Sequence, residues 1–443
     1  MGNLMEGNKR LKIVKVCDWV VFGILLAVYT AVTFWLFYHQ SIGNENWFHS
    51  DVKAYILEMQ GLDSGYDFPY PVFFKLGAFF NLFLSPQMAI TIALTILNSA
   101  AVAVMKWYMN RQFVKEDGLI SHRIFSGSDK GWKSEGELEA WTGSGTEGKK
   151  ELAVQILLRL VLSALTLTLF FVSMLFSVTG RPLPGIEYRY KGVFSPNPYH
   201  NATYMATRPF AIICFFMFAE ILQSYEKKFS WKKGILFGLF LLLTTMTKPS
   251  FTFVLVGTAG LIMVYRLVRS RFSNLRPTIL LGLMFLPTFC DLIYQFFGVF
   301  GPREGEETGV GFGWLTAWQY HCGNIPLAVL LGMAFPILVL IIHHKDLKTD
   351  TLYRFSIQIA AMGLAMAMLL YEKGFRLPDM NFSWGYMHGM FFAFVGAAIV
   401  LLRSTMLKSK KWYLLSLEWM LYLWHLGCGL LYFKNSLAGY LYY

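Results

Sequence analysis

The chain has 443 residues, of which 55% are hydrophobic, 17% aromatic and only 15% charged. A soluble core could not bury so much apolar surface, which makes lipid the solvent for much of the chain. The formal net charge of +12 does not indicate nucleic-acid binding, because the Lys and Arg residues form short clusters between apolar runs. The five cysteines show no paired spacing, so we expect neither a disulfide framework nor a zinc site.

Apolar runs of about twenty residues, long enough to cross a bilayer, follow one another along the chain. They fall near 17–38, 86–105, 153–178, 204–223, 277–297, 325–343, 353–371, 385–403 and 412–433. A shorter pair near 234–247 and 249–267 is separated by Thr247-Lys248-Pro249-Ser250, which predicts a tight turn at the outer membrane face. We therefore expect an all-α, polytopic transmembrane bundle of about eleven spans that forms one domain over 1–443.

The Lys and Arg clusters predict the orientation, because translocation of short loops that carry these residues is disfavoured. With the N-terminus inside, the cytoplasmic clusters are Lys9/Arg10/Lys12/Lys15, Lys227/Lys228/Lys232/Lys233, Arg266/Arg269/Arg271/Arg276 and Lys408/Lys410/Lys411. A further stretch, 106–151, is rich in Gly, Ser, Glu and Lys and is predicted to be a cytoplasmic loop. The sequence thus predicts a multi-pass protein of the plasma membrane, with a cytoplasmic N-terminus and an external C-terminus.

The first external loop, 39–85, contains two apolar segments, 50–62 and 70–84, that are short for a full span. Counting 70–84 as a span would place the later Lys and Arg clusters outside, so we expect both segments to form amphipathic helices in the outer interface. The other predicted external loops are 179–203, 298–324 and 372–384.

Asp51 follows the first span within Asn46-Trp47-Phe48-His49-Ser50-Asp51. A carboxylate at the water–lipid boundary, beside aromatic side chains, is suited to accept a proton from an attacking hydroxyl, so Asp51 is the candidate base and His49 a candidate substrate contact. Alternatively, Asp51 only caps the helix that starts at Val52. Asp63 is better explained as a turn residue beside Gly65.

Further polar residues stand at the outer ends of later spans. His200 and Asn201 are candidate substrate contacts, and Arg208 lies about one turn inside the apolar run that follows them. A guanidinium there requires a polar cavity or an anion, unless the side chain extends to the interface. Lys248 in the turn between two short spans could bind phosphate as a point charge, or could likewise extend to water.

The external segments 303–321 and 372–388 mix charged residues with Trp, Tyr and Gly, which is typical of a surface that contacts sugars or headgroups. Arg376 with Lys373 could bind a phosphate or a diphosphate. The candidate substrate contacts in these segments are Tyr320, His321 and His388. Three acids, Glu304, Glu306 and Glu307, could bind a metal or an acceptor, or could simply be solvated.

A carboxylate just after span one, interfacial helices, about eleven spans and later external cations together resemble the C-type membrane glycosyltransferases, the GT-C superfamily. The segments HSD (49–51), YHNATYMATRPF (199–210) and TKPSF (247–251) look like those of bacterial members of this group. The resemblance implies inverting transfer of a sugar from a polyprenyl-phosphate carrier to a glycan or lipid-linked acceptor on the external face, with Asp51 as base. The resemblance also implies a role in cell-envelope polysaccharide biosynthesis.

Some GT-C members have two adjacent acids at this place, whereas this chain has Ser50-Asp51-Val52. The missing second acid argues against a paired-acid, metal-bound site, and a divalent metal such as Mg or Mn stays an alternative. Three other functions remain alternatives: a polysaccharide polymerase or ligase, a flippase or transporter of lipid-linked sugars, and a membrane O-acyltransferase. A transporter is expected to have paired interrupted helices in its two halves. The sequence indicates one interruption, at 247–250.

Overall fold

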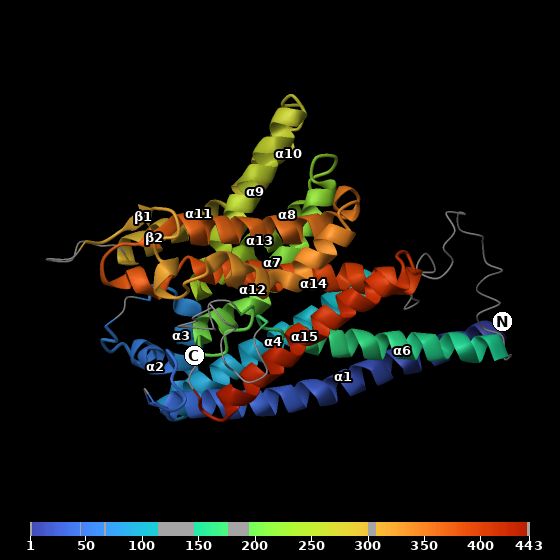
Figure 1. Cartoon of the computed structure of the whole chain (residues 1–443), viewed down its shortest axis with the longest axis horizontal. Helices are drawn as coiled ribbons and strands as arrows, with labels where there is room; N and C mark the ends of the chain where they lie inside the picture. Colours follow the sequence, from blue (N-terminus) through green and yellow to red (C-terminus); the bar gives the residue numbers. More distant parts are fainter. Residues whose placement is uncertain are drawn as a thin grey trace.

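The computed structural model describes residues 2–44, 46–65, 68–113, 146–175, 195–299 and 307–440. The described part is almost entirely helical, and most of the long helices run back and forth along the long axis of the molecule (Figure 1). In chain order, the helices are α1 (Gly2–Ile42), α2 (Val52–Gln60), α3 (Pro71–Asn81), α4 (Pro86–Phe113), α6 (Thr146–Leu169), α7 (Ala202–Ser224), α8 (Trp231–Thr247), α9 (Ser250–Arg269), α10 (Leu275–Leu283), α11 (Leu286–Val299), α12 (Ile325–Ile342), α13 (Thr351–Leu369), α14 (Ser383–Leu407) and α15 (Trp412–Leu437).

Within the described residues, eight helices are long and apolar enough to cross a membrane, and nine do so if the bent pair α10 and α11 forms one span. The apolar part of α6 and the whole of α8 are shorter than the about twenty residues of a perpendicular span. A multi-pass helical membrane protein is thus confirmed. A helix lies at each of the eleven predicted spans, but eleven crossings are not established.

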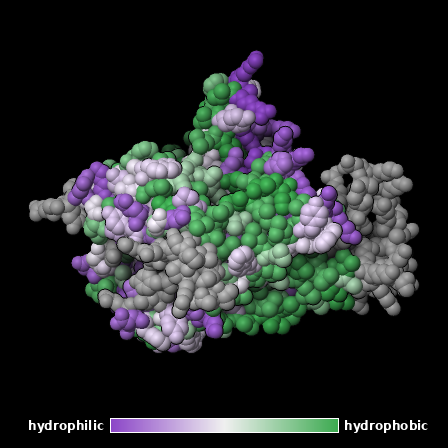
Figure 2. Space-filling view, in the orientation of Figure 1, coloured by the Kyte–Doolittle hydropathy of each residue, from purple (hydrophilic) through white to green (hydrophobic). Residues whose placement is uncertain are grey.

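The surface agrees with this assignment. Figure 2 shows a broad apolar region over the middle of the bundle, with hydrophilic residues at the left end and along the upper right, up to the tip of the projecting helices. The short helices α2 and α3 and the strands β1 (Val310–Phe312) and β2 (Leu370–Glu372) gather at the left end (Figure 1). We call this the α2/β end.

Helix boundaries extend beyond the apolar runs. Residues 106–113 of the predicted cytoplasmic loop are helical, because α4 continues to Phe113 with Tyr108 and Met109 buried; residues 114–145 lie outside the described part. The predicted span 277–297 is interrupted by a bend of 47° between α10 and α11. The predicted interfacial segments do contain helices, α2 and α3, and Lys248 does lie in a break between α8 and α9.

The core is built around α14, which is buried along most of its length. It packs closely on α13 because glycines remove side-chain bulk at the contact. A Cβ atom at Gly363 would lie 2.9 Å from the Cα atom of Tyr386, and one at Gly389 would lie 2.9 Å from the Cα atom of Ala360. Small residues at such contacts are the usual way for transmembrane helices to approach each other.

One cluster of charged residues inside the bundle consists of ion-paired side chains. The Asp18 carboxylate of α1 accepts a hydrogen bond of 2.9 Å from Lys106 of α4 and lies 3.4 Å from a guanidinium nitrogen of Arg159 of α6. The Ser163 hydroxyl accepts a further hydrogen bond from Lys106, at 2.8 Å. Because an unpaired charge is costly in a membrane interior, this cluster ties α1, α4 and α6 together.

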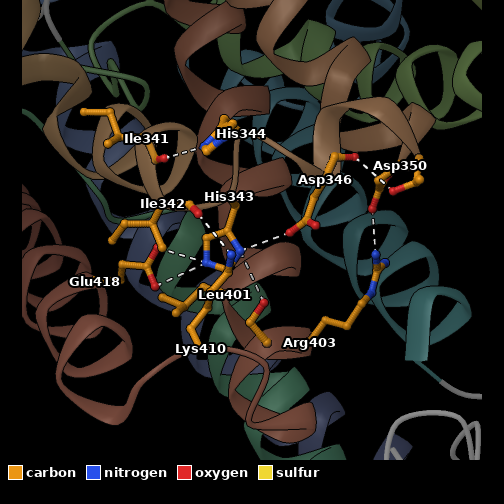
Figure 3. A network of polar contacts seen from close by, with 12 residues as sticks. Ile341, Ile342, His343, His344, Asp346, Asp350, Leu401, Arg403, Lys410 and Glu418 are labelled. Atoms are coloured by element: carbon orange, nitrogen blue, oxygen red, sulfur yellow. Dashed lines mark hydrogen bonds and ion pairs between the residues drawn. The ribbon is translucent and has the colours of Figure 1, made fainter. Parts of the chain in front are cut away.

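A second network joins the last four long helices at the end opposite the cavity described below (Figure 3). Nε2 of His343, after α12, lies 3.1 Å from Glu418 of α15, and its Nδ1 lies 3.1 Å from the Asp346 carboxylate. Arg403 of α14 donates a 2.6 Å hydrogen bond to Asp350, the N-cap of α13. These contacts fix the ends of α12 to α15 relative to one another.

Candidate functional site

The α2/β end contains a cavity of about 700 Å³. Eight of the predicted site residues line it: Asp51, His49, His200, Asn201, Lys248, Arg376, Tyr320 and His321. These residues are far apart in the sequence. The fold brings them together because each one lies at a helix end or in a loop of the α2/β end. Their chemical roles remain predictions.

Asp51 does not act as a side-chain cap. It occupies the position before α2, but its carboxylate makes no capping hydrogen bond. Instead, Oδ2 accepts a 2.6 Å hydrogen bond from the Asn201 amide and a 3.4 Å one from the Tyr55 hydroxyl. Within the described residues, Oδ1 accepts none. Burial raises the pKa of Asp51, and the positive charge of Lys248 and the Asn201 hydrogen bond oppose this rise.

Lys248 is 7% exposed, so its side chain does not extend to water. Its Nζ donates to the Thr203 hydroxyl at 3.0 Å and to the Asn201 carbonyl oxygen at 3.3 Å, and lies 4.8 Å from the Trp384 ring centroid. No carboxylate of the described residues lies within ion-pair distance of it. Burial lowers the pKa of Lys248 to about 8, against the opposing field of Asp51. A buried cation that faces a cavity without an anion partner is a candidate anion site.

Two histidines, His49 and His200, line the cavity together with Asp51 and Lys248. The ring of His200 is buried, with its centroid 5.7 Å from that of Trp384. Burial, together with His49 and Lys248, lowers the pKa of His200 to about 3. His200 is therefore neutral at physiological pH and offers a hydrogen bond without a charge.

Another part of the cavity wall comes from the β1–β2 pair, in which Val310 is opposite Glu372 in antiparallel register. The Glu372 carboxylate accepts a 2.6 Å hydrogen bond from Asn381, and burial raises the pKa of Glu372. Arg376 and Asp379, in the 3₁₀ helix Gly374–Asp379, complete a polar wall that carries both signs of charge. Such a wall suits a ligand with several hydroxyl groups.

A third part of the cavity is apolar and is contributed by α9 and α11. Phe253 of α9 and Phe296 of α11 line the cavity. Next to Phe296 on α11, Ile293 and Phe297 do not line the cavity and are 59% and 70% exposed on the outside of the protein. In a membrane protein, this outer surface faces lipid, so the cavity wall is continuous with the lipid-facing surface. Val254, Leu292 and Val299 extend the same apolar wall.

Three predicted phosphate or substrate contacts do not line the cavity. Arg208 is 1% exposed and donates to the Asn197 side chain and, at 3.1 Å, to the Pro196 carbonyl oxygen. Lys373 forms a 2.7 Å ion pair with Glu307 near the surface. His388 is stacked on Tyr204, with ring centroids 4.1 Å apart. These three residues contact other protein groups and do not line this cavity, and the roles expected for them stay predictions.

The structure adds residues that sequence analysis did not select: Tyr55, Asp379, Asn381, Glu372 and Trp384. Tyr55 had a detectable signal, because a helical residue four positions after Asp51 lies on the same face. The described residues contain no group of three or more His, Cys, Asp or Glu side chains that could hold a metal ion. Of the acids proposed for a metal, Glu304 and Glu306 lie outside the described part.

The fold and the cavity define a class: a multi-pass helical membrane protein with a part-charged, part-apolar cavity at one end of its bundle. Comparison with protein-family models, with curated proteins and with solved structures finds no match to this chain.

Proposed function

We propose that this chain is an inverting membrane glycosyltransferase that moves a sugar from a polyprenyl-phosphate carrier to an acceptor hydroxyl at the external face of the plasma membrane. The observation that carries the proposal is that Asp51 and Lys248 line one cavity, both in contact with Asn201, beside an apolar wall that continues to the lipid-facing surface. A carrier lipid needs the apolar wall, its phosphate needs a cation, and the acceptor needs a base.

In this reaction the acceptor oxygen attacks the anomeric carbon while the bond from that carbon to the phosphate oxygen breaks. The bonding electrons leave with the polyprenyl phosphate, and Lys248 and Arg376 stabilise the charge on its phosphate. The acceptor proton goes to Asp51. A single displacement inverts the anomeric configuration and leaves no sugar on the enzyme. The acceptor is a glycan or a lipid-linked sugar, bound by the wall around Glu372 and Asn381.

The test uses purified protein in lipid with radiolabelled polyprenyl-phosphate forms of glucose, mannose, galactose and arabinofuranose. Wild type should release free polyprenyl phosphate from one of these donors, and Asp51→Asn should not. The matched control is Asp63→Asn in the same loop, where the side chain accepts a 2.8 Å hydrogen bond from the Gly65 amide, as asparagine also can. Full activity of folded Asp51→Asn would refute the assignment of the base.

A flippase for lipid-linked sugars is a second candidate because of one observation. The bend of 47° between α10 and α11 interrupts an apolar run. Interrupted helices of this kind are typical of transporters, in which they occur at corresponding positions of the two halves. Binding of a lipid-linked oligosaccharide and its movement across vesicles, without release of polyprenyl phosphate from any donor, would favour the flippase.

A further inference from the structure

Asn201 connects two charged residues of the cavity, Asp51 and Lys248, through its side chain. Its amide nitrogen lies 2.6 Å from Oδ2 of Asp51 and 3.0 Å from the Tyr55 hydroxyl. Its carbonyl oxygen accepts from the Tyr204 backbone amide at 2.9 Å and from Lys248 at 3.3 Å. Asn201 is 3% exposed, so water does not compete with these contacts.

The neighbours leave only one orientation for this amide. The backbone N–H of Tyr204 and the ammonium group of Lys248 can only donate, so the atom that faces them must be the oxygen. The atom that faces Asp51 is therefore the NH₂ group, and it donates to Oδ2. Since the described residues donate nothing to Oδ1, one carboxylate oxygen is held and the other is left for a ligand.

We propose that Asn201 is a positioning residue that turns the Asp51 carboxylate so that Oδ1 faces the acceptor hydroxyl and that favours its charged form. This role differs from the direct substrate contact that we expected for Asn201 from the sequence. It rests on the proposed function, in which Asp51 is the base. The hydrogen bond from Asn201 is one of the interactions that oppose the rise in the pKa of Asp51 caused by burial.

The other charged and titratable groups around Asp51 come from every neighbouring segment. They are His49 on its own segment, Tyr55 of α2, Tyr70 before α3, His200 before α7, Lys248 between α8 and α9, and Asp379 before α14. Variants of Asn201 leave all of these in place, so a change in the titration of Asp51 can be attributed to the lost amide.

Two substitutions separate positioning from helix capping, because Asn201 is also the N-cap of α7. Asn201→Ser keeps a good N-cap and removes the NH₂ donor. Asn201→Asp keeps the acceptor for Tyr204 and Lys248 but sets a second carboxylate against Asp51. We expect the Asp51 titration midpoint to move up by roughly one pH unit in the serine variant, and further in the aspartate variant.

The midpoint is measured by infrared difference spectroscopy of the carboxyl band that Asp51→Asn removes, which needs no substrate. The acid limb of the pH profile of kcat/KM should move by the same amount. The matched control is Asn324→Asp at the N-cap of α12, where the side chain accepts from the Leu327 amide and no cavity residue is involved. This control should leave the Asp51 midpoint at its wild-type value.

Wild-type midpoints in both Asn201 variants would overturn the inference, whatever the activity. If the midpoints move but no donor is turned over by wild type, the control of Asp51 by Asn201 stands and the proposed function fails. A merely structural role would lower the melting temperature without moving the midpoint.

Discussion

Lys248 provides the sharpest test of the cavity as a phosphate site. The ligand for this test is the carrier product, a polyprenyl phosphate, compared with the uncharged polyprenol of the same length. A hydrogen bond to a charged group is worth about 1.5–3 kcal/mol. At about 1.4 kcal/mol per tenfold, loss of that bond corresponds to a roughly 10- to 150-fold loss of affinity. Lys248→Ala should therefore weaken binding of the phosphate by that factor and leave binding of the alcohol nearly unchanged.

The pH dependence adds a second measure. The pKa of Lys248 is lowered to about 8, so the ammonium group is charged below that pH and loses its charge above it. A phosphate monoester has its second pKa near 6, so its charge is constant above about pH 7. Wild-type affinity for the phosphate should then fall as pH rises through about 8, and in Lys248→Arg, which keeps its charge, this fall should be absent.

Binding is measured by ligand-induced quenching of intrinsic tryptophan fluorescence in lipid nanodiscs between pH 6.5 and 9.5. The matched control is Lys75→Ala, an exposed lysine of α3 at the same end of the bundle that does not line the cavity. The reasoning is refuted if Lys248→Ala still prefers the phosphate over the alcohol as strongly as wild type. It is also refuted if the wild-type preference is the same at pH 7 and pH 9.5.

Two further predictions concern stability. A Cβ atom at Gly429 would overlap the Phe171 carbonyl oxygen, so Gly429→Ala should destabilise the protein by about 1–3 kcal/mol. The control is Gly427→Ala, where a Cβ atom would lie in open space and stability should not change. Thermal unfolding in detergent compares the two variants. Asp18→Ala leaves the buried Lys106 without its anion and should lower the free energy of unfolding by about 3–5 kcal/mol. The double variant Asp18→Ala with Lys106→Met should recover part of that loss in the same assay. If stability does not recover, the ion pair is not the cause of the loss.

Hydropathy predicted where the helices are, because apolar runs report contact with lipid directly. It could not predict where they end. Two helices continue past their apolar runs: α1, which has 41 residues, and α4, which extends to Phe113. The bend between α10 and α11 was also missed, because the run 277–297 is apolar on both sides of it.

The site was predicted in part, for a related reason. Asp51, Asn201 and Lys248 each stand where a helix starts or stops at one end of the bundle, so their position along the chain already placed them together. Glu372 depends instead on the pairing of β2 with β1, a contact between segments about sixty residues apart that no local pattern encodes. A loop residue of this kind can be assigned to the site only when the hydrogen bonds that fold the loop are known.

Arg208 and Lys248 show why a buried cation alone does not identify a ligand site. Both lie beside apolar helices and both are nearly inaccessible. Arg208 donates hydrogen bonds to the carbonyl oxygen of Pro196 and to the side chain of Asn197. Its guanidinium carbon also lies within 5 Å of the ring centroids of Phe170 and Phe391. The ammonium group of Lys248 donates to two neutral oxygens and lies near one aromatic ring, and Lys248 lines a cavity. The two cations differ in their partners. Substitution of Lys248 should therefore weaken binding of an anion in the cavity, whereas Arg208→Lys should leave that binding unchanged.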